Sequence, residues 1–230
     1  MLDPAALPAL PSLLSPPRFQ TYLNTYPGRQ DLALRLYAWN VEVTSAFWGP
    51  VSVLEVVVRN AIHDALRKGR QDDWWNSPSV HLMDRERRNI DQAHETLTRR
   101  GVTSPTAGQV VAATTFGLWV GLTDEGIPRH PFLSYETALW QPRLMRAFPY
   151  AAGVRRKQLH RALDDVRNFR NRLAHHEPIY AAPLAKIRDD IVDLASYIDP
   201  AASSFIADAN QIDVALARKQ TAITNGHSLI

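Results

Sequence analysis

The chain has 230 residues, of which 45% are hydrophobic and 21% are charged. This composition is typical of a globular protein with a buried core, and it excludes a disordered chain, a collagen-like protein and a long coiled coil. Cysteine is absent, which excludes disulfides, thiolate nucleophiles and cysteine-ligated zinc or iron–sulfur centres. The formal net charge is +3, and 22 of the 26 basic residues are arginine, whose planar fork suits phosphate.

The N-terminal 17 residues contain five prolines and one acidic residue, and they predict an extended arm. No cationic segment precedes an apolar stretch there, so we expect no signal peptide. Because the chain has no uninterrupted run of 18 apolar residues, we also expect no membrane-spanning segment and a cytoplasmic location.

Helical periodicity begins at Asp31. We expect it to break at Gly49-Pro50, because proline removes a backbone hydrogen bond from a helix. A second helix is predicted from about Val51 to Arg67, where a basic last turn is followed by Gly69.

Two start signals for helices follow. Asn76-Ser77-Pro78 offers an N-cap and an N1 proline for a polar helix that reaches about Arg99. Ser104-Pro105 repeats the signal for a short helix through Val111. The segment 114–122 is apolar on all sides, so we expect it to be buried.

The remaining part of the chain predicts a loop at 124–137 and then further helices. These helices are expected at about residues 136–147, 154–176, 182–198 and 204–220. No strand-like alternation occurs, so we predict an all-α fold, a helical bundle in one domain. The expected organisation is an arm at 1–17, a helical domain at 18–200, and a C-terminal helix with a polar tail at 201–230.

The segment 154–176 has two faces when it is placed on a helix. Its apolar positions form one stripe at spacings of four and three: Ala162, Val166, Phe169 and Leu173. Arg167, Asn171 and His175 are each four residues apart and lie roughly opposite that stripe. We therefore expect this second face to meet water or another subunit.

Arg170 and His175 are five residues apart, about 140° around the helix, so we expect them to flank a shallow groove. An imidazole exchanges protons near neutral pH, and a guanidinium stabilises charge that develops on phosphorus. Together they suit attack of an RNA 2′-hydroxyl on its own phosphate, a reaction that needs no metal.

Positive charge is concentrated between Arg143 and Arg172. This stretch has nine basic residues against two acids, Asp164 and Asp165. Such an excess predicts an anionic partner, although a solvated helix surface has the same pattern.

The stretch from Arg167 to Ile179, RNFRNRLAHHEPI, resembles the signature of the Abi-like (abortive infection) proteins of the HEPN superfamily. The catalytic motif of that superfamily is an arginine, a polar residue, three to five further residues and a histidine. The matching residues here are Arg170, Asn171 and His175. The resemblance spans roughly Ser15 to Pro200, in these further blocks: Ser15-Pro16-Pro17-Arg18-Phe19, Leu36-Tyr37-Ala38-Trp39-Asn40, Leu54–Ile62, Phe116-Gly117-Leu118-Trp119, Leu139-Trp140 and Ala147-Phe148-Pro149.

The resemblance implies an all-helical, HEPN-type endoribonuclease that acts in phage defence or as a toxin. It implies metal-independent cleavage that leaves a 2′,3′-cyclic phosphate, and a homodimer in which two motifs share one RNA groove. A small RNA or protein antitoxin is an implied partner. In this reading Arg170 stabilises the phosphorane, His175 exchanges the proton, and Asn171 positions the phosphate or His175.

A second polar group lies on the helix expected at Val51–Arg67 and consists of Glu55, Arg59, Asn60 and His63. Glu55, Arg59 and His63 are each four residues apart and so lie near one face. One interpretation is an intrahelical salt bridge with Asn60 capping a neighbouring loop. In the other interpretation these residues orient Arg170 or His175, or they contact further phosphates of the RNA in the same groove.

Three residues beside the motif have a related interpretation. Arg167, Arg172 and Tyr180 are candidates for RNA binding or for support of the motif. Related HEPN toxins carry a tyrosine near the position of Tyr180, but a packed aromatic side chain fits that position equally well.

No metal or other cofactor is expected. His175, His176 and Glu177 are adjacent, and neighbouring residues on a helix point about 100° apart, so they do not share one ion. Gly117 and Gly121 are not followed by the lysine of a phosphate loop, and they predict close helix packing instead.

Two other classes of function stay open from the sequence. One is a non-catalytic RNA-binding or regulatory HEPN module, and the other is a structural interaction protein. RNA affinity with steep salt dependence separates the first from the second, and product formation separates an enzyme from both.

Overall fold

The structure is a computed structural model that describes residues 9–228. Within these residues the protein is all-α, without a strand; the β-structure there is one isolated bridge between Gly126 and Ser134. The first helices are α1 (Leu10–Leu13), α2 (Pro16–Thr25), α3 (Gln30–Arg67), the 3₁₀ turn η1 (Trp74–Asn76), α4 (Asp84–Arg99), α5 (Ala107–Ala113) and α6 (Phe116–Leu122). They are followed by the π-helical turn η2 (Glu136–Trp140), the 3₁₀ turn η3 (Leu144–Ala147), α7 (Arg156–Ala174), α8 (Leu184–Ile198), α9 (Pro200–Asp208) and α10 (Ile212–Asn225).

The chain divides into two compact units. The first contains the described residues as far as Val51, Phe169–Asp189, and the described residues from Ile206 onward; the second contains Ser52–Asn168 and Asp190–Phe205. The boundaries fall within α3, α7, α8 and α9, so each of these four helices contributes residues to both units. The division differs in its boundaries from the expected segments 1–17, 18–200 and 201–230, and those domain limits stay a prediction.

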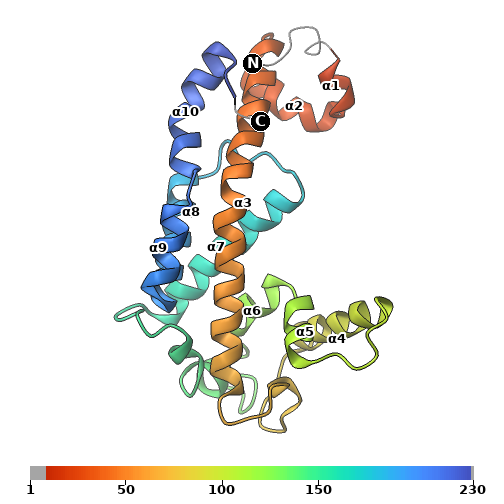
Figure 1. Cartoon of the computed structure of the whole chain (residues 1–230), viewed down its shortest axis with the longest axis vertical. Coiled ribbons are helices and arrows are strands. Elements are labelled where there is room, and N and C mark those ends of the chain that lie inside the picture. The colour runs from red at the N-terminus through yellow and green to blue at the C-terminus, as the bar shows by residue number, and fades with distance from the viewer. Residues whose placement is uncertain (1–8, 229–230) are drawn as a thin grey trace. The chain divides into compact units, whose positions relative to one another are not determined.

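The core of the first unit is built around aromatic side chains of α3. Phe47 meets Phe169 of α7 with ring centroids 4.7 Å apart. Trp39 is buried, donates a 2.8 Å hydrogen bond to the Ala215 carbonyl, and carries Lys219 over its ring at 4.7 Å. These contacts place α10 alongside the N-terminal half of α3 (Figure 1).

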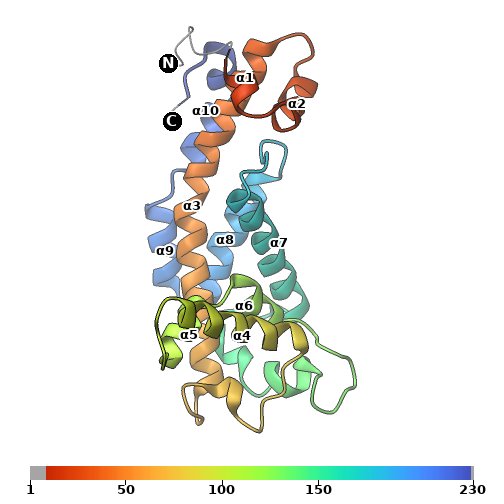
Figure 2. The same ribbon diagram turned by 90° about the vertical axis from the view of Figure 1, so that its right-hand side faces the viewer.

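The core of the second unit combines the C-terminal half of α3 with three short helices. α4 packs against both α5 and α6, and the three lie together in both views (Figures 1 and 2). As expected, the apolar segment 114–122 is mostly buried, since α6 contributes five buried side chains: Phe116, Leu118, Trp119, Val120 and Leu122. Gly121 permits close packing, because a Cβ there would lie 2.5 Å from the Glu86 Oε1 atom.

The expected break at Gly49-Pro50 is wrong, because α3 runs for 38 residues through Pro50. Proline disfavours helical geometry in the preceding residue partly through a clash with its Cβ, which Gly49 lacks. On either side, Phe47 and Val51 are buried, so packing stabilises the helix against the lost hydrogen bond.

The N-terminal arm also differs from the expected extended segment. Residues 1–8 lie outside the described residues, but α1 and the start of α2 make much of residues 9–17 helical. Pro11 and Pro16 lie in the first turns of these helices, where a missing N–H removes no intrahelical bond.

Two other helix limits are corrected. α4 begins at Asp84 and not near Asn76, whose side chain donates to the Asp73 carboxylate at 3.1 Å. The last expected helix is two helices, α9 and α10, and Asn210 starts the second by accepting a 2.6 Å hydrogen bond from the Ile212 N–H.

Within residues 9–228, α3 is the helix whose length and composition would allow it to cross a membrane, with a window of mean hydropathy 1.4. Core helices of soluble proteins meet the same criteria, and 39% of that window is buried within the chain. The helix is therefore weak support for a membrane span, and a cytoplasmic location stays a prediction.

Candidate functional site

The motif lies where α7 ends in the first unit. The Glu177 N–H bonds to the Arg172 carbonyl at 2.9 Å, and the His176 N–H bonds to the Leu173 carbonyl at 3.1 Å. This pair of bonds is a Schellman motif, with His175 as the C-cap and His176 in the left-handed region at φ 54°. His175 thus follows the last helical residue, Ala174, where its position is fixed by the helix end.

The motif side chains lie on the surface, as the helical wheel predicts. Asn171 and His175 are exposed and Arg170 is half-buried, whereas Phe169 and Leu173 of the apolar stripe are buried. Among the described residues, the side chains of Asn171 and His175 make no hydrogen bond. Both polar groups are therefore available to a ligand.

Arg18 is a functional candidate that the sequence analysis did not single out, although it lies in one of the blocks that resemble the family. Its Nη2 atom lies 3.5 Å from the His175 carbonyl oxygen, and its side chain is exposed. The next residue, Phe19, is buried and anchors α2. The structure therefore adds a second guanidinium beside the end of α7.

Arg172 is engaged within the chain. Its guanidinium donates to the Pro178 carbonyl, and its Nε lies 3.6 Å from the Glu177 carboxylate. These contacts hold the loop that follows α7 against the end of that helix. They therefore favour a role for Arg172 in positioning this loop over direct contact with RNA.

Tyr180 is packed as well. Its hydroxyl donates to the Thr21 carbonyl at 3.1 Å and lies 2.8 Å from the Thr25 Oγ1. Its ring lies 5.3 Å from that of Tyr22, and its backbone N–H bonds to the Asn40 Oδ1 at 3.1 Å. The geometry favours the packed-aromatic interpretation, in which Tyr180 holds the loop after α7 against α2 and α3.

Arg167, three residues before Arg170, belongs to the second unit. It forms an ion pair with Asp164 at 2.7 Å and donates to the Asn168 side chain at 3.2 Å. Its Nε is buried without a hydrogen bond. Most of its charge is thus compensated on its own helix.

The group on α3 also belongs to the second unit, and its four residues have different surroundings. The Nε of Arg59 is buried without a hydrogen bond, so this nitrogen does not bind the Glu55 carboxylate. Asn60 is exposed beside a cavity and makes no cap. Glu55 is half-buried.

His63 is part of a tryptophan cluster. Its Nδ1 accepts a 3.1 Å hydrogen bond from the Trp74 indole, and its ring lies 6.5 Å from the rings of Trp75 and Trp119. Burial lowers the pKa of His63 below its usual value of 6.5, which favours the neutral ring that accepts from Trp74. This environment supports a structural role.

A buried polar network in the second unit gave no sequence signal. Glu86 accepts from the Arg85 Nε at 2.5 Å and from the Tyr135 hydroxyl at 3.1 Å, and that hydroxyl accepts from the Met83 N–H at 2.7 Å. Arg85 also pairs with Asp124 at 3.0 Å. Burial raises the pKa of Tyr135, so its hydroxyl stays a donor. The partners come from distant parts of the chain, which is why spacing did not indicate them.

The described residues contain no cluster of three or more side chains able to ligate a metal. Comparison of the chain with protein-family models, with curated proteins and with solved structures found no match. The function is therefore argued from the chemistry of the residues at the end of α7.

Proposed function

We propose that the protein is a metal-independent endoribonuclease of the HEPN type, similar to the Abi-like proteins, with Arg170, Asn171 and His175 as its catalytic residues. The observation that carries the proposal is that Asn171 and His175 are exposed, without side-chain hydrogen bonds, at the helix end that also holds Arg170. Polar side chains that the fold does not engage are available to bind a substrate.

In the proposed reaction the 2′-oxygen of a ribose attacks the adjacent phosphorus, and the bond to the 5′-oxygen of the next nucleotide breaks. A histidine accepts the proton of the 2′-hydroxyl, and a protonated histidine donates a proton to the departing 5′-oxygen. The products are a 2′,3′-cyclic phosphate and a 5′-hydroxyl, so no water is consumed.

A homodimer supplies both proton-transfer groups, since each copy contributes one His175 to a shared groove. Arg170 stabilises the negative charge on the phosphorane, and Asn171 orients a phosphate oxygen or the imidazole. Arg18 offers a further guanidinium for the RNA backbone.

The test is cleavage of a labelled RNA under single-turnover conditions with EDTA, with the product ends determined by mass spectrometry. The wild-type protein should leave 2′,3′-cyclic phosphate and 5′-hydroxyl ends, and an RNA with 2′-deoxyribose at the cleaved position should stay intact. Arg170→Ala and His175→Ala should lose cleavage, whereas His176→Gly, which removes the neighbouring imidazole, should retain it. Loss of wild-type activity with EDTA, restored by a divalent ion, would contradict the proposal.

The biological role proposed with this activity is phage defence or toxicity, with a small RNA or protein antitoxin as partner. Expression of the wild-type protein should arrest growth, and expression of His175→Ala should not. Equal growth arrest by both proteins would contradict the link between cleavage and toxicity.

A non-catalytic RNA-binding module is the second candidate, and the basic side chains near the start of α7 favour it. Arg155, Lys157 and Arg161 are exposed and form no ion pair within the described residues. RNA binding that weakens steeply with salt, with no product from the wild-type dimer, would support this candidate over the nuclease.

A further inference from the structure

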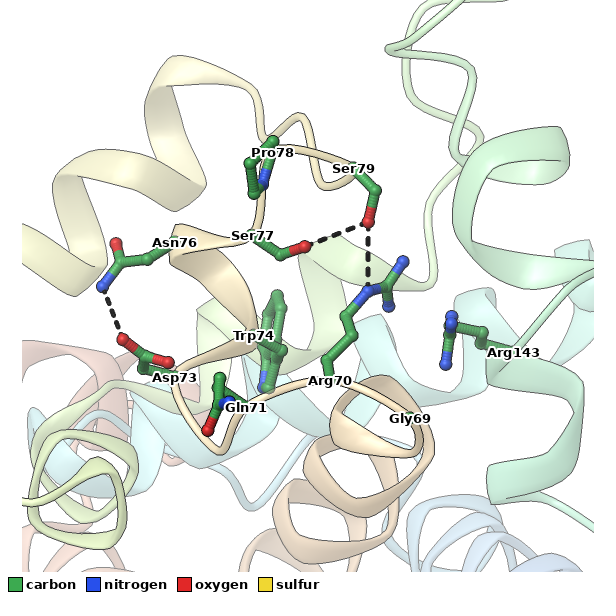
Figure 3. A pocket seen from close by; sticks show the side chains of 10 residues that line it. All are labelled: Gly69, Arg70, Gln71, Asp73, Trp74, Asn76, Ser77, Pro78, Ser79 and Arg143. Carbon is green, nitrogen blue, oxygen red and sulfur yellow. Dashed lines mark hydrogen bonds between the residues drawn. The ribbon is translucent and has the colours of Figure 1, made fainter.

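A cavity of about 690 Å³ lies beyond the C-terminal end of α3, within the second unit (Figure 3). It is lined by residues of the loop after α3 together with one arginine from just before η3: Gly69, Arg70, Gln71, Asp73, Trp74, Asn76, Ser77, Pro78, Ser79 and Arg143. Its volume is in the range of about 300–1,000 Å³ that is typical of sites for small molecules.

Two guanidinium groups face this cavity from neighbouring positions (Figure 3). Arg70 donates through Nη1 to the Leu66 carbonyl at 3.0 Å and through Nε to the Ser79 hydroxyl at 3.2 Å. Arg143 donates through Nη1 to the Lys68 carbonyl. These contacts fix the positions of both side chains. Because each guanidinium has five N–H groups, most of its donors are left for a ligand.

No carboxylate compensates these two charges within the described residues. Asp73, the acidic residue of the lining, accepts a hydrogen bond from Asn76 at 3.1 Å, and Figure 3 shows this pair across Trp74 from the arginines. Burial and the charge of Arg143 both lower the pKa of Arg70. Two half-buried like charges that repel each other favour an anion between them.

The arginines also have a structural role, because their hydrogen bonds satisfy carbonyls at the end of α3 and their charge complements its dipole. One hydrogen bond from each arginine is enough to satisfy these carbonyls. The capping role does not explain why two guanidiniums converge on one cavity, nor why the Ser77 and Ser79 hydroxyls lie 3.0 Å apart beside them.

We propose that this cavity is a binding site for the phosphate group of a nucleotide, held by Arg70 and Arg143 with the hydroxyl of Ser79. Phosphate oxygens accept from two guanidinium forks at once, and the remaining volume accommodates more than the phosphate itself. The proposal does not depend on the nuclease, since the site lies in a different unit from Arg170 and His175 and binding is measured without cleavage.

The experiment is isothermal titration calorimetry of the full chain in chloride buffer. The three probes are inorganic phosphate, a 5′-mononucleotide and a short 2′-deoxy oligonucleotide, which has no 2′-hydroxyl and is therefore not cleaved. Arg143→Gln should weaken phosphate and mononucleotide binding about tenfold or more. Arg146→Gln changes an exposed arginine that lines another cavity, and it should bind as the wild type does.

A second variant separates ligand binding from helix capping. Ser79→Asp places a carboxylate beside Arg70, so it should abolish phosphate binding while the protein stays folded by circular dichroism. Tighter binding of the mononucleotide than of phosphate supports a free nucleotide as ligand. Tightest binding of the oligonucleotide supports a nucleic-acid phosphate when Arg143→Gln weakens that binding, since Arg143 lines this cavity and not the end of α7. Absence of binding by all three probes, or equal affinities in the wild type and Arg143→Gln, would overturn the proposal.

Discussion

The polar groups at the end of α7 and those around Glu86 differ in how far the protein itself satisfies them. Glu86 is only 2% exposed, and both of its carboxylate oxygens accept hydrogen bonds, from Arg85 and from Tyr135. Asn171 and His175 are exposed and make no side-chain hydrogen bond among the described residues. A buried group with all its hydrogen bonds made, such as Glu86, is typical of a network that stabilises the fold. Exposed polar side chains without such bonds, such as Asn171 and His175, are typical of a ligand-binding surface.

The difference matters because either region alone resembles an active site. The cluster of Arg85, Glu86, Asp124 and Tyr135 contains two carboxylates, a guanidinium and a phenol, but these groups bind one another. A fully paired cluster stabilises the fold, whereas a group without partners contributes little to stability and is free to act on substrate. Substitutions in the two regions should therefore affect different properties of the protein.

The largest effect on stability is expected for Glu86→Ala. It removes the buried acceptor of the Tyr135 hydroxyl, whereas Arg85 is half exposed and keeps Asp124 as a partner, so the free energy of unfolding should fall by about 2 kcal/mol. Urea denaturation measures this change. Glu95→Ala, on the same helix but exposed, is the control and should stay within about 0.5 kcal/mol of the wild type. A loss below 1 kcal/mol for Glu86→Ala would mean that the network is not stabilising.

Arg18→Ala is expected to reduce RNA cleavage about tenfold, because it removes a charged donor near His175. The free energy of unfolding of the Arg18→Ala protein should change little, since the Arg18 side chain is exposed. Single-turnover rates measure the effect, and Arg29→Ala, another exposed arginine in the first unit, serves as the matched control. Equal rates for Arg18→Ala and wild type would remove Arg18 from the site.

His176→Gly should raise the free energy of unfolding by about 1 kcal/mol, because glycine adopts the left-handed conformation at φ 54° without a Cβ penalty. Cleavage should be unchanged. A thermal melt is sufficient to measure the gain. A marked fall in activity would show that His176, and not only His175, takes part in the reaction.

The smallest effect concerns the pH dependence of stability through His63. Its pKa is lower in the folded protein than its usual 6.5, so below pH 6.5 the unfolded chain binds a proton that the folded chain does not. The free energy of unfolding should therefore fall as the pH decreases from about 6.5 toward the folded pKa. His63→Gln keeps an acceptor for Trp74 and should reduce this dependence; the same slope in both proteins would contradict the assignment.

The sequence predicts the all-α class, the limits of α7 and α8 to within about two residues, the buried α6, and the exposed face that carries Asn171 and His175. These features depend on local periodicity, which the tertiary structure preserves. The continuation of α3 through Pro50 is not local, because it depends on what packs against Phe47 and Val51.

The same reason explains which site residues the sequence does not indicate. Arg18 is 157 positions from His175, and Arg143 is 75 positions from Lys68, so no spacing pattern joins them. The Schellman motif at His176 was also not predicted, since glycine is the usual residue at that position. By contrast, a packed aromatic side chain is one of the two interpretations that the sequence leaves open for Tyr180, and it agrees with the contacts of this residue.

The most direct test measures cleavage and unfolding on one preparation of His175→Ala beside the wild type. Removing the proton-transfer group should slow cleavage at least about a hundredfold. The free energy of unfolding should stay within about 0.5 kcal/mol, because the side chain is exposed and makes no hydrogen bond among the described residues. Cleavage at the wild-type rate by a fully folded His175→Ala would contradict the role of this imidazole and, with it, the proposed nuclease.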